Sequence, residues 1–227
     1  MRMPLTFTAA MLAPAILLTA CADQKPQQLQ GVSGPAMSEQ DIGGRPTLAY
    51  LAPGADLRKY KRFILDTVTV YRGSDAQFGD ATDADKQQLA QYMHSTFANA
   101  LGSRYSIVTK PGPDVARIHL TLGGLEDSTP VVSTASHVLP VGLVTNLVNE
   151  QSGKPASFSA SVTIAGEIRD SQTNKLEVSF IQKRFPDAMD ISDSMVARDG
   201  QKAAIKDTAD TFRARVDKIQ AGGSATE

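Results

Sequence analysis

The alternation of apolar and polar residues along the chain predicts a β-hairpin in its second half. In residues 158–168 apolar side chains alternate strictly with polar ones, as in a strand with one buried and one solvent-facing side. Residues 176–184 begin with the same alternation, and the sequence DSQTN connects the two runs. Asn tolerates the left-handed conformation that such turns need, so Asn174 is expected to adopt it.

Three shorter strands are predicted before this hairpin. Residues 62–71 are rich in β-branched and aromatic side chains on both faces, which is typical of a central strand. Residues 105–109 and 115–122 follow, and the sequence KPGPD between them is a strong turn signal.

Two helices are predicted from apolar residues at helical spacing. The first begins after Thr82, which forms a capping-box-like pair with Asp85, and is expected to end at a Gly102 cap. The second runs from about residue 199 to 219. Its inner stripe is Ile205, Thr208, Ala209, Phe212, Val216 and Ile219. The order β-α-β-β-β-β-α predicts a single α/β domain of the α+β type, with a mixed, largely antiparallel sheet and two main helices.

The first 20 residues are predicted to be a signal peptide. Arg2 carries their only charge, and the apolar stretch 5–18 is too short to cross a bilayer as a helix. The sequence LLTAC then resembles the lipobox of bacterial lipoproteins. That resemblance implies cleavage between Ala20 and Cys21, and attachment of acyl chains such as palmitate to Cys21. Several acyl chains on one residue would anchor the protein stably.

Two alternatives for this segment are an ordinary signal peptide with a chance cysteine after it, and a buried structural cysteine. Cys21 is the only cysteine, so an internal disulfide is impossible. In Gram-negative lipoproteins an aspartate directly after the lipidated cysteine tends to retain the protein in the inner membrane. Ala22 stands there, so the resemblance implies the outer membrane, facing the periplasm.

The chain is therefore expected to have four parts. They are a signal peptide (1–20), the lipidated cysteine with a flexible tether (21–46), an α/β lipoprotein domain (47–219) and a disordered tail (220–227). The tether is rich in Gln, Gly and Pro and has no apolar period. A coil of this length would average about 25–30 Å from end to end.

The charge balance narrows the set of partners. After cleavage the chain has 22 basic residues (23 less Arg2) and 24 acidic ones, so its net charge is about −2. No basic patch dominates, which argues against nucleic acid and against electrostatic binding to a membrane. The expected partners are the membrane, through the lipid, and either an envelope protein or a second copy of the chain.

An ordered set of motifs resembles a known family. It comprises YLAPGADLRKYKRFILDTVTVY, a helix, VTKPGPDVARIHLTL, VLPVGLV and IAGEIRDSQTNKLEV. Together they are similar to the domain-of-unknown-function 3313 family of bacterial lipoproteins, over residues 47–216. The family hairpin usually reads D-S-x-T-G-E, whereas Asn174 and Lys175 stand here in place of Gly and Glu. The resemblance implies a lipoprotein location and brings no established activity, cofactor or catalytic residue.

No motif in the sequence predicts catalysis or metal binding. The three histidines, His94, His119 and His137, lack metal-ligand spacing, and no G-x-S-x-G elbow or phosphate-binding loop occurs. The acidic residues of FPDAMDISD (185–193) are spaced too widely for a calcium loop. We therefore expect no enzyme, no metal and no cofactor. A hydrolase in which Ser, His and Asp meet only in space is a weaker hypothesis.

The apolar stretch VVSTASHVLPVGLVTNLV (131–148) has two interpretations. It is either a buried connection or short helix, or an exposed patch that contacts a partner. The residues of that possible surface are Val138, Leu139, Pro140, Val141 and Leu143.

The sequence thus favours an outer-membrane lipoprotein with a non-enzymatic periplasmic binding or accessory domain. The alternative is an oligomeric component of an envelope secretion or assembly complex.

Overall fold

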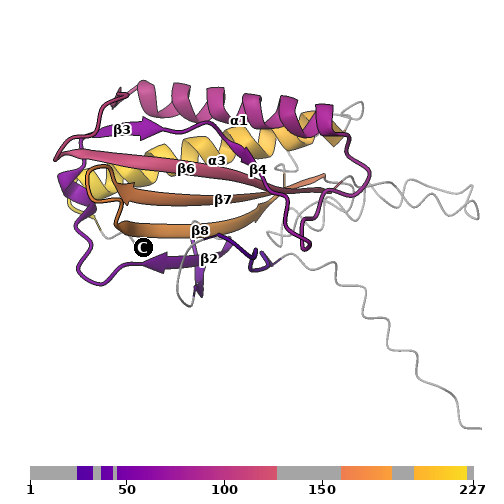
Figure 1. Ribbon diagram of the computed structural model, residues 1–227, viewed down its shortest axis with the longest axis horizontal. Coiled ribbons are helices and arrows are strands. Elements are labelled where there is room, and N and C mark those ends of the chain that lie inside the picture. Colours follow the sequence, from indigo (N-terminus) through magenta and orange to yellow (C-terminus); the bar gives the residue numbers. More distant parts are fainter. Residues whose placement is uncertain (1–24, 33–36, 43–44, 127–159, 186–196, 224–227) are drawn as a thin grey trace, which may run out of the picture.

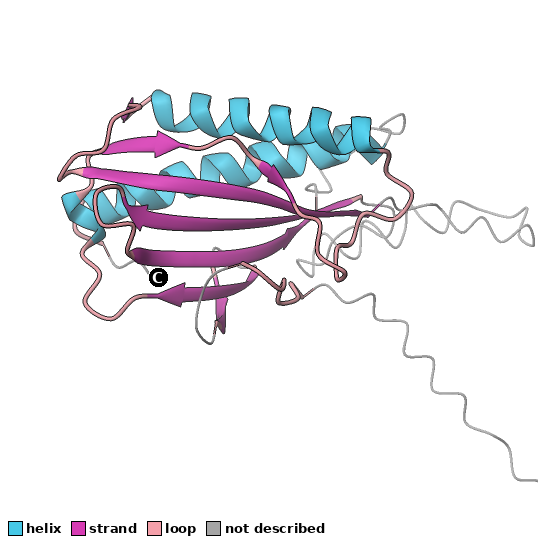
Figure 2. Ribbon diagram, in the orientation of Figure 1, coloured by secondary structure: helices cyan, strands magenta, loops and turns pink. Residues whose placement is uncertain are grey.

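A mixed eight-stranded sheet with two long helices forms the domain (Figures 1 and 2). The computed structural model describes residues 25–32, 37–42, 45–126, 160–185 and 197–223. The strands are β1 (Ser38–Asp41), β2 (Pro46–Leu51), β3 (Arg62–Leu65), β4 (Thr69–Val70), β5 (Ser106–Ile107), β6 (Val115–Glu126), β7 (Ser161–Asp170) and β8 (Leu176–Arg184). The helices are α1 (Asp83–Gly102), α3 (Ala197–Gln220) and the short 3-10 helix η1 (Leu57–Lys59).

The sheet confirms the predicted α+β class. Its strand order is β1-β2-β8-β7-β6-β3-β5, and β4 also pairs with β6. The pairings β3–β5, β3–β6 and β4–β6 are parallel, and the other pairings are antiparallel. Strands β6, β7 and β8 form the long centre of the sheet, as the predicted hairpin requires.

The helices bury one face of this sheet. Phe97 of α1 and Phe212 of α3 have ring centroids 5.8 Å apart, and Phe212 lies 6.1 Å from Phe180 of β8. The aromatic contacts therefore connect both helices to the sheet. The predicted inner stripe of α3 is confirmed: its residues are buried, except for the partly buried Phe212, which packs against the core.

The first predicted strand, 62–71, is interrupted in the structure. Leu65 pairs with Ile118 and Thr69 pairs with Thr121. Between these two pairings the β3–β4 segment contains one more residue than β6 does, so the ladder cannot continue. The run is therefore two strands, β3 and β4, separated by residues 66–68.

Of the two predictions about the ends of α1, the one for its N-terminus is confirmed and the one for its C-terminus is wrong. Thr82 Oγ1 accepts a hydrogen bond from the Asp85 N–H (3.2 Å), and the Asp85 carboxylate accepts one from the Thr82 N–H (3.3 Å), so the capping box is confirmed. The expected Gly102 cap is wrong. Gly102 is the last helical residue, and Ser103, in the right-handed helical conformation, is the cap.

The prediction of one solvent-facing side for the 158–168 strand is also wrong. Ser161, Thr163 and Ala165 of β7 are all less than 5% exposed. The cover on this face comes from the expected tether, in which Leu29 is only 2% exposed and packs with Ala165 and Ile181. The tether contains β1 as well, which pairs with β2 through its backbone and so needs no apolar period.

Two family motifs meet at the end of the sheet where β7 turns into β8. The Asp170 carboxylate accepts hydrogen bonds from the backbone N–H of Gln172 (3.1 Å) and Thr173 (3.0 Å) and from Lys59 Nζ (3.2 Å), and the Tyr60 hydroxyl lies 3.0 Å away. Asn174 has the predicted left-handed backbone, with φ of 59°. The DSQTN turn is therefore a structural junction that ties the hairpin to η1.

The KPGPD turn joins the same junction. Ser171 Oγ accepts a hydrogen bond from the Gly112 N–H and donates one to the Gly112 carbonyl, both at 3.1 Å. The hydrogen bonds from the Thr173 backbone, Lys59 and Tyr60 hold the pKa of Asp170 well below its usual range.

Asp170→Asn should destabilise the protein and change its response to acid. Because folding lowers the pKa of Asp170, its contribution is complete above the pKa of an unfolded aspartate, about 4, and is lost as the pH falls through the folded value. The substitution should lower the free energy of unfolding at pH 7 by about 2 kcal/mol. It should also make the loss of stability below pH ~4 shallower, as measured by urea unfolding over a pH series. The exposed Asp80→Asn is the matched control, and an acid slope equal to that of wild type would contradict the assignment.

Candidate functional site

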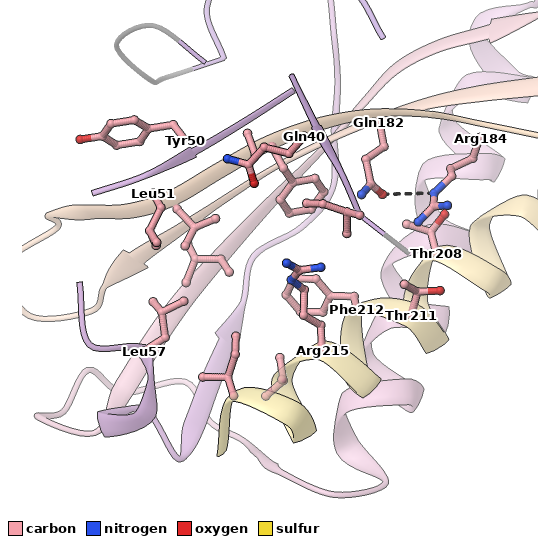
Figure 3. Close-up of a pocket in the computed structure, with 17 residues that line it drawn as sticks. Gln40, Tyr50, Leu51, Leu57, Gln182, Arg184, Thr208, Thr211, Phe212 and Arg215 are labelled. Carbon is pink, nitrogen blue, oxygen red and sulfur yellow. Dashed lines mark hydrogen bonds between the residues drawn. The ribbon is translucent and has the colours of Figure 1, made fainter. Parts of the chain in front are cut away.

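A cavity of about 90 Å³ lies between α3 and the β2–β8 part of the sheet (Figure 3). Its lining is mostly apolar. Among the contributing side chains are Ala49 and Leu51 of β2, Val178 and Phe180 of β8, and Phe212 and Val216 of α3.

The local sequence explains this cavity. Side chains of a strand alternate between its faces, so Val178, Phe180 and Gln182 of β8 all point toward α3. On β2 the residue paired with Phe180 is Ala49. Its small side chain leaves space beside the ring that a larger residue would fill.

A chain of hydrogen bonds crosses the polar end of the cavity. Arg184 Nε donates to Gln182 Oε1 (3.2 Å), and Gln182 Nε2 donates to Thr47 Oγ1 (3.0 Å). The Thr47 hydroxyl in turn donates to the Arg45 carbonyl (3.2 Å). Thr47, Gln182 and Arg184 are buried, so these bonds satisfy polar groups that water does not reach.

Two residues give the cavity its particular border. Arg215 extends from α3 into the middle of the space, and burial lowers the pKa of its guanidinium (Figure 3). Leu51 is 37% exposed, which makes it one of two large apolar side chains that the described part of the chain leaves open to solvent. The border of the cavity therefore combines an apolar contact surface at Leu51 with the partly desolvated cation of Arg215.

A second hollow, of about 260 Å³, lies on the opposite face of the sheet. It is lined by residues of β4, β6 and β7 and by Gly31 and Val32 of the N-terminal segment. His119 Nε2 lies 3.2 Å from the Thr69 hydroxyl, and His119 Nδ1 lies 3.9 Å from Asp66 Oδ2. The structure thus brings a hydroxyl, an imidazole and a carboxylate together, but the hydroxyl belongs to a threonine and not to the serine that the hydrolase hypothesis named.

The contact between His119 and Asp66 differs from that of a nucleophile–base–acid relay. A relay needs the carboxylate to accept a hydrogen bond from the histidine, and 3.9 Å is too long for one. The other carboxylate oxygen of Asp66 accepts a 2.6 Å hydrogen bond from Arg117. The three side chains are better described as a polar surface row across neighbouring strands.

Most of the site residues predicted from sequence lie outside the described part of the chain. They are Ala20, Cys21, His137, Val138, Leu139, Pro140, Val141 and Leu143, together with the acidic residues of 185–193 after Phe185. His94 is described: its Nδ1 lies 3.2 Å from the Asp66 carbonyl oxygen, which is a structural contact. Within the described ranges no group of three or more His, Cys, Asp or Glu side chains could hold a metal ion, and no helix there is long and apolar enough to span a membrane.

The cavity under α3 was not predicted from sequence. Its residues come from elements up to 179 positions apart, Gln40 and Ile219 among them. The only sequence signal was the inner stripe of α3, which predicts a buried face and says nothing about where packing is incomplete.

Comparison with known proteins identifies one family, and the solved structures described below are distant from this chain. The model of the family described as "Protein of unknown function (DUF3313)" matches residues 32–212. No curated protein sequence shows significant similarity to the chain.

Several solved structures are distantly similar to this chain. The PelC dodecamer from Paraburkholderia phytofirmans is 10% identical, with a TM-score of 0.39 over 74% of this chain and 97% of that one. A candidate lipoprotein from Caulobacter crescentus CB15 is 11% identical, with a TM-score of 0.34 over 74% and 93% of the two chains. A PDZ domain protein from Parabacteroides distasonis is 12% identical, with a TM-score of 0.38 over 83% and 37%. Likeness at this level does not establish a shared function.

Gln182→Leu should destabilise the protein because it breaks the hydrogen-bond chain at the cavity. The buried Thr47 hydroxyl would lose the bond from Gln182, and Arg184 Nε would lose the bond to Gln182 Oε1, which should cost about 1–3 kcal/mol in chemical unfolding. Gln40→Leu makes the same chemical change at another lining position, where the amide bonds only an exposed serine, and should change stability little. Equal losses of stability from the two substitutions would show that the hydrogen bonds of Gln182 do not stabilise the fold.

Proposed function

The chain belongs to the DUF3313 family of proteins of unknown function, and we propose that it acts there as an outer-membrane lipoprotein whose periplasmic domain binds a protein partner. The proposal has two parts: anchoring through Cys21, and binding through the cavity under α3.

Anchoring is supported by the order of features in the first 21 residues. A single positive charge, a short apolar stretch and small residues precede the only cysteine of the chain. Acylation gives that cysteine a chemical role that no disulfide could supply. The residue after it is Ala22, which fits delivery to the outer membrane.

The cavity is the observation that carries the binding part of the proposal. An engineered protein cavity of about 150 Å³ admits benzene, so a space of about 90 Å³ accepts a smaller group, such as one aliphatic side chain. The exposed Leu51 beside it offers further apolar contact. Arg is also enriched at the centres of protein interfaces, where Arg215 would lie. A protein that inserts an apolar side chain suits this border.

A non-enzymatic role fits the chemistry of the described residues. The Asp66 carboxylate accepts a hydrogen bond from Arg117 and lies too far from His119 to accept one from it, as a catalytic relay would need. The largest pKa changes lie at Tyr60 and Asp170, which hold the hairpin junction together. The perturbed pKa values of Tyr60 and Asp170 are therefore explained by their structural role.

Photo-crosslinking from the cavity should identify the partner. A benzophenone amino acid at Thr211, which lines the cavity on α3, should crosslink one envelope protein in intact cells. The same amino acid at Ala214, an exposed position on the same helix, should give a much weaker product. Crosslinks between two copies of the chain would support the oligomeric alternative instead, and equal products from both positions would contradict a partner site at the cavity.

Cys21→Ala should release the protein from the membrane. Incorporation of labelled palmitate should be lost, and the chain should move from the outer-membrane fraction to the soluble periplasmic fraction. Membrane association that is unchanged in the Cys21→Ala variant, with palmitate labelling intact, would contradict the anchoring proposal.

A further inference from the structure

The segment 25–32, here called the strap, lies across the sheet face that the helices leave open. Leu29 packs on Ala165 and Ile181, both of which are fully buried. Gly123 of β6 makes this possible, because a Cβ at that position would lie 2.6 Å from Leu29 Cδ1. The glycine therefore leaves a socket that receives one leucine side chain.

Polar contacts fix the strap on both sides of Leu29. The Gln30 N–H donates to Asp75 Oδ2 (2.9 Å), and the Tyr71 hydroxyl contacts both the Gln30 carbonyl and the Asp75 carboxylate. The hydrogen bond to Asp75, with some burial, raises the pKa of Tyr71 to about 12. On the other side Gln77 Nε2 donates to Gln27 Oε1 (3.0 Å).

The position of the strap limits how far the domain can lie from its anchor. Cys21 precedes Lys25 by only four residues, which span at most about 14 Å when fully extended. If the strap left the sheet, about 17 residues would separate Cys21 from β1. A coil of that length averages roughly 20–25 Å and extends to about 60 Å.

We infer that the strap is a docking device that holds the domain against the lipid surface, with the Leu29 socket setting the distance. This inference rests on the proposed acylation of Cys21. The strap joins the sheet on the face opposite the helices, and the cavity under α3 lies on the helix-covered face. The docked strap and the proposed partner site therefore lie on opposite sides of the sheet.

The acylated chain in vesicles tests this inference. A donor dye on Gln91→Cys, an exposed position of α1, would report energy transfer to acceptor lipids in vesicles of phosphatidylethanolamine and phosphatidylglycerol. Leu29→Ser, which empties the socket, and Gly123→Ala, which blocks it, should both lower the transfer efficiency. Gln28→Ser, an exposed neighbour of Leu29, should leave it at the wild-type value. Equal transfer in all four proteins would overturn the inference.

Docking can also be measured without the lipid, which separates this inference from the proposed function. In the Cys21→Ala chain, Leu29→Ser should lower the melting temperature by roughly 5 °C, and Gln28→Ser should not change it. An unchanged melting temperature with Leu29→Ser would overturn docking. A wild-type chain that carries no acyl group would instead overturn the anchoring proposal, and with it the role of the strap at a membrane.

Discussion

Burial of β7 on both faces is the constraint on which the rest of the structure depends. Val162 and Ile164 face the helix-covered core, and Thr163 and Ala165 face the strap. All four side chains are less than 5% exposed. A strand buried on both sides needs cover from two directions. The two helices supply one cover, and a short N-terminal segment supplies the other, so a segment expected to be a plain tether becomes part of the fold.

Two turn motifs that carry the family resemblance have a structural role in the fold. The DSQTN and KPGPD turns meet through Ser171 and Gly112, and Asp170 connects them to Lys59 and Tyr60. Asp170 and Ser171 each have a hydrogen-bond partner from another motif. A sequence signature can therefore be specific for a family and still carry no information about its ligand.

The sequence predicted the parts of the fold that depend on local patterns. The β7–β8 hairpin, the left-handed Asn174, the capping box at Thr82 and the inner stripe of α3 follow from residue type and spacing, and all are confirmed. The interruption between β3 and β4 was not predictable, because it depends on register against β6. The strap was missed because a single leucine in a polar segment has no periodicity, and its socket exists only once Gly123, Ala165 and Ile181 are together in space. The cavity under α3 was missed for the same reason, since incomplete packing is a property of the assembled elements.

The strap, which follows the proposed anchor in the sequence, lies on one face of the sheet, and the apolar cavity lies on the other. Docking of the strap is the link between them, and the amide of Gln30 reports on it most directly because it donates to the Asp75 carboxylate. In hydrogen exchange under native conditions this amide should exchange as slowly as the amides of the β1–β2 hairpin. It should become fast when Leu29 is replaced by Ser. Exchange of the wild-type Gln30 amide at the rate of a free peptide would contradict the docked strap and the account built on it.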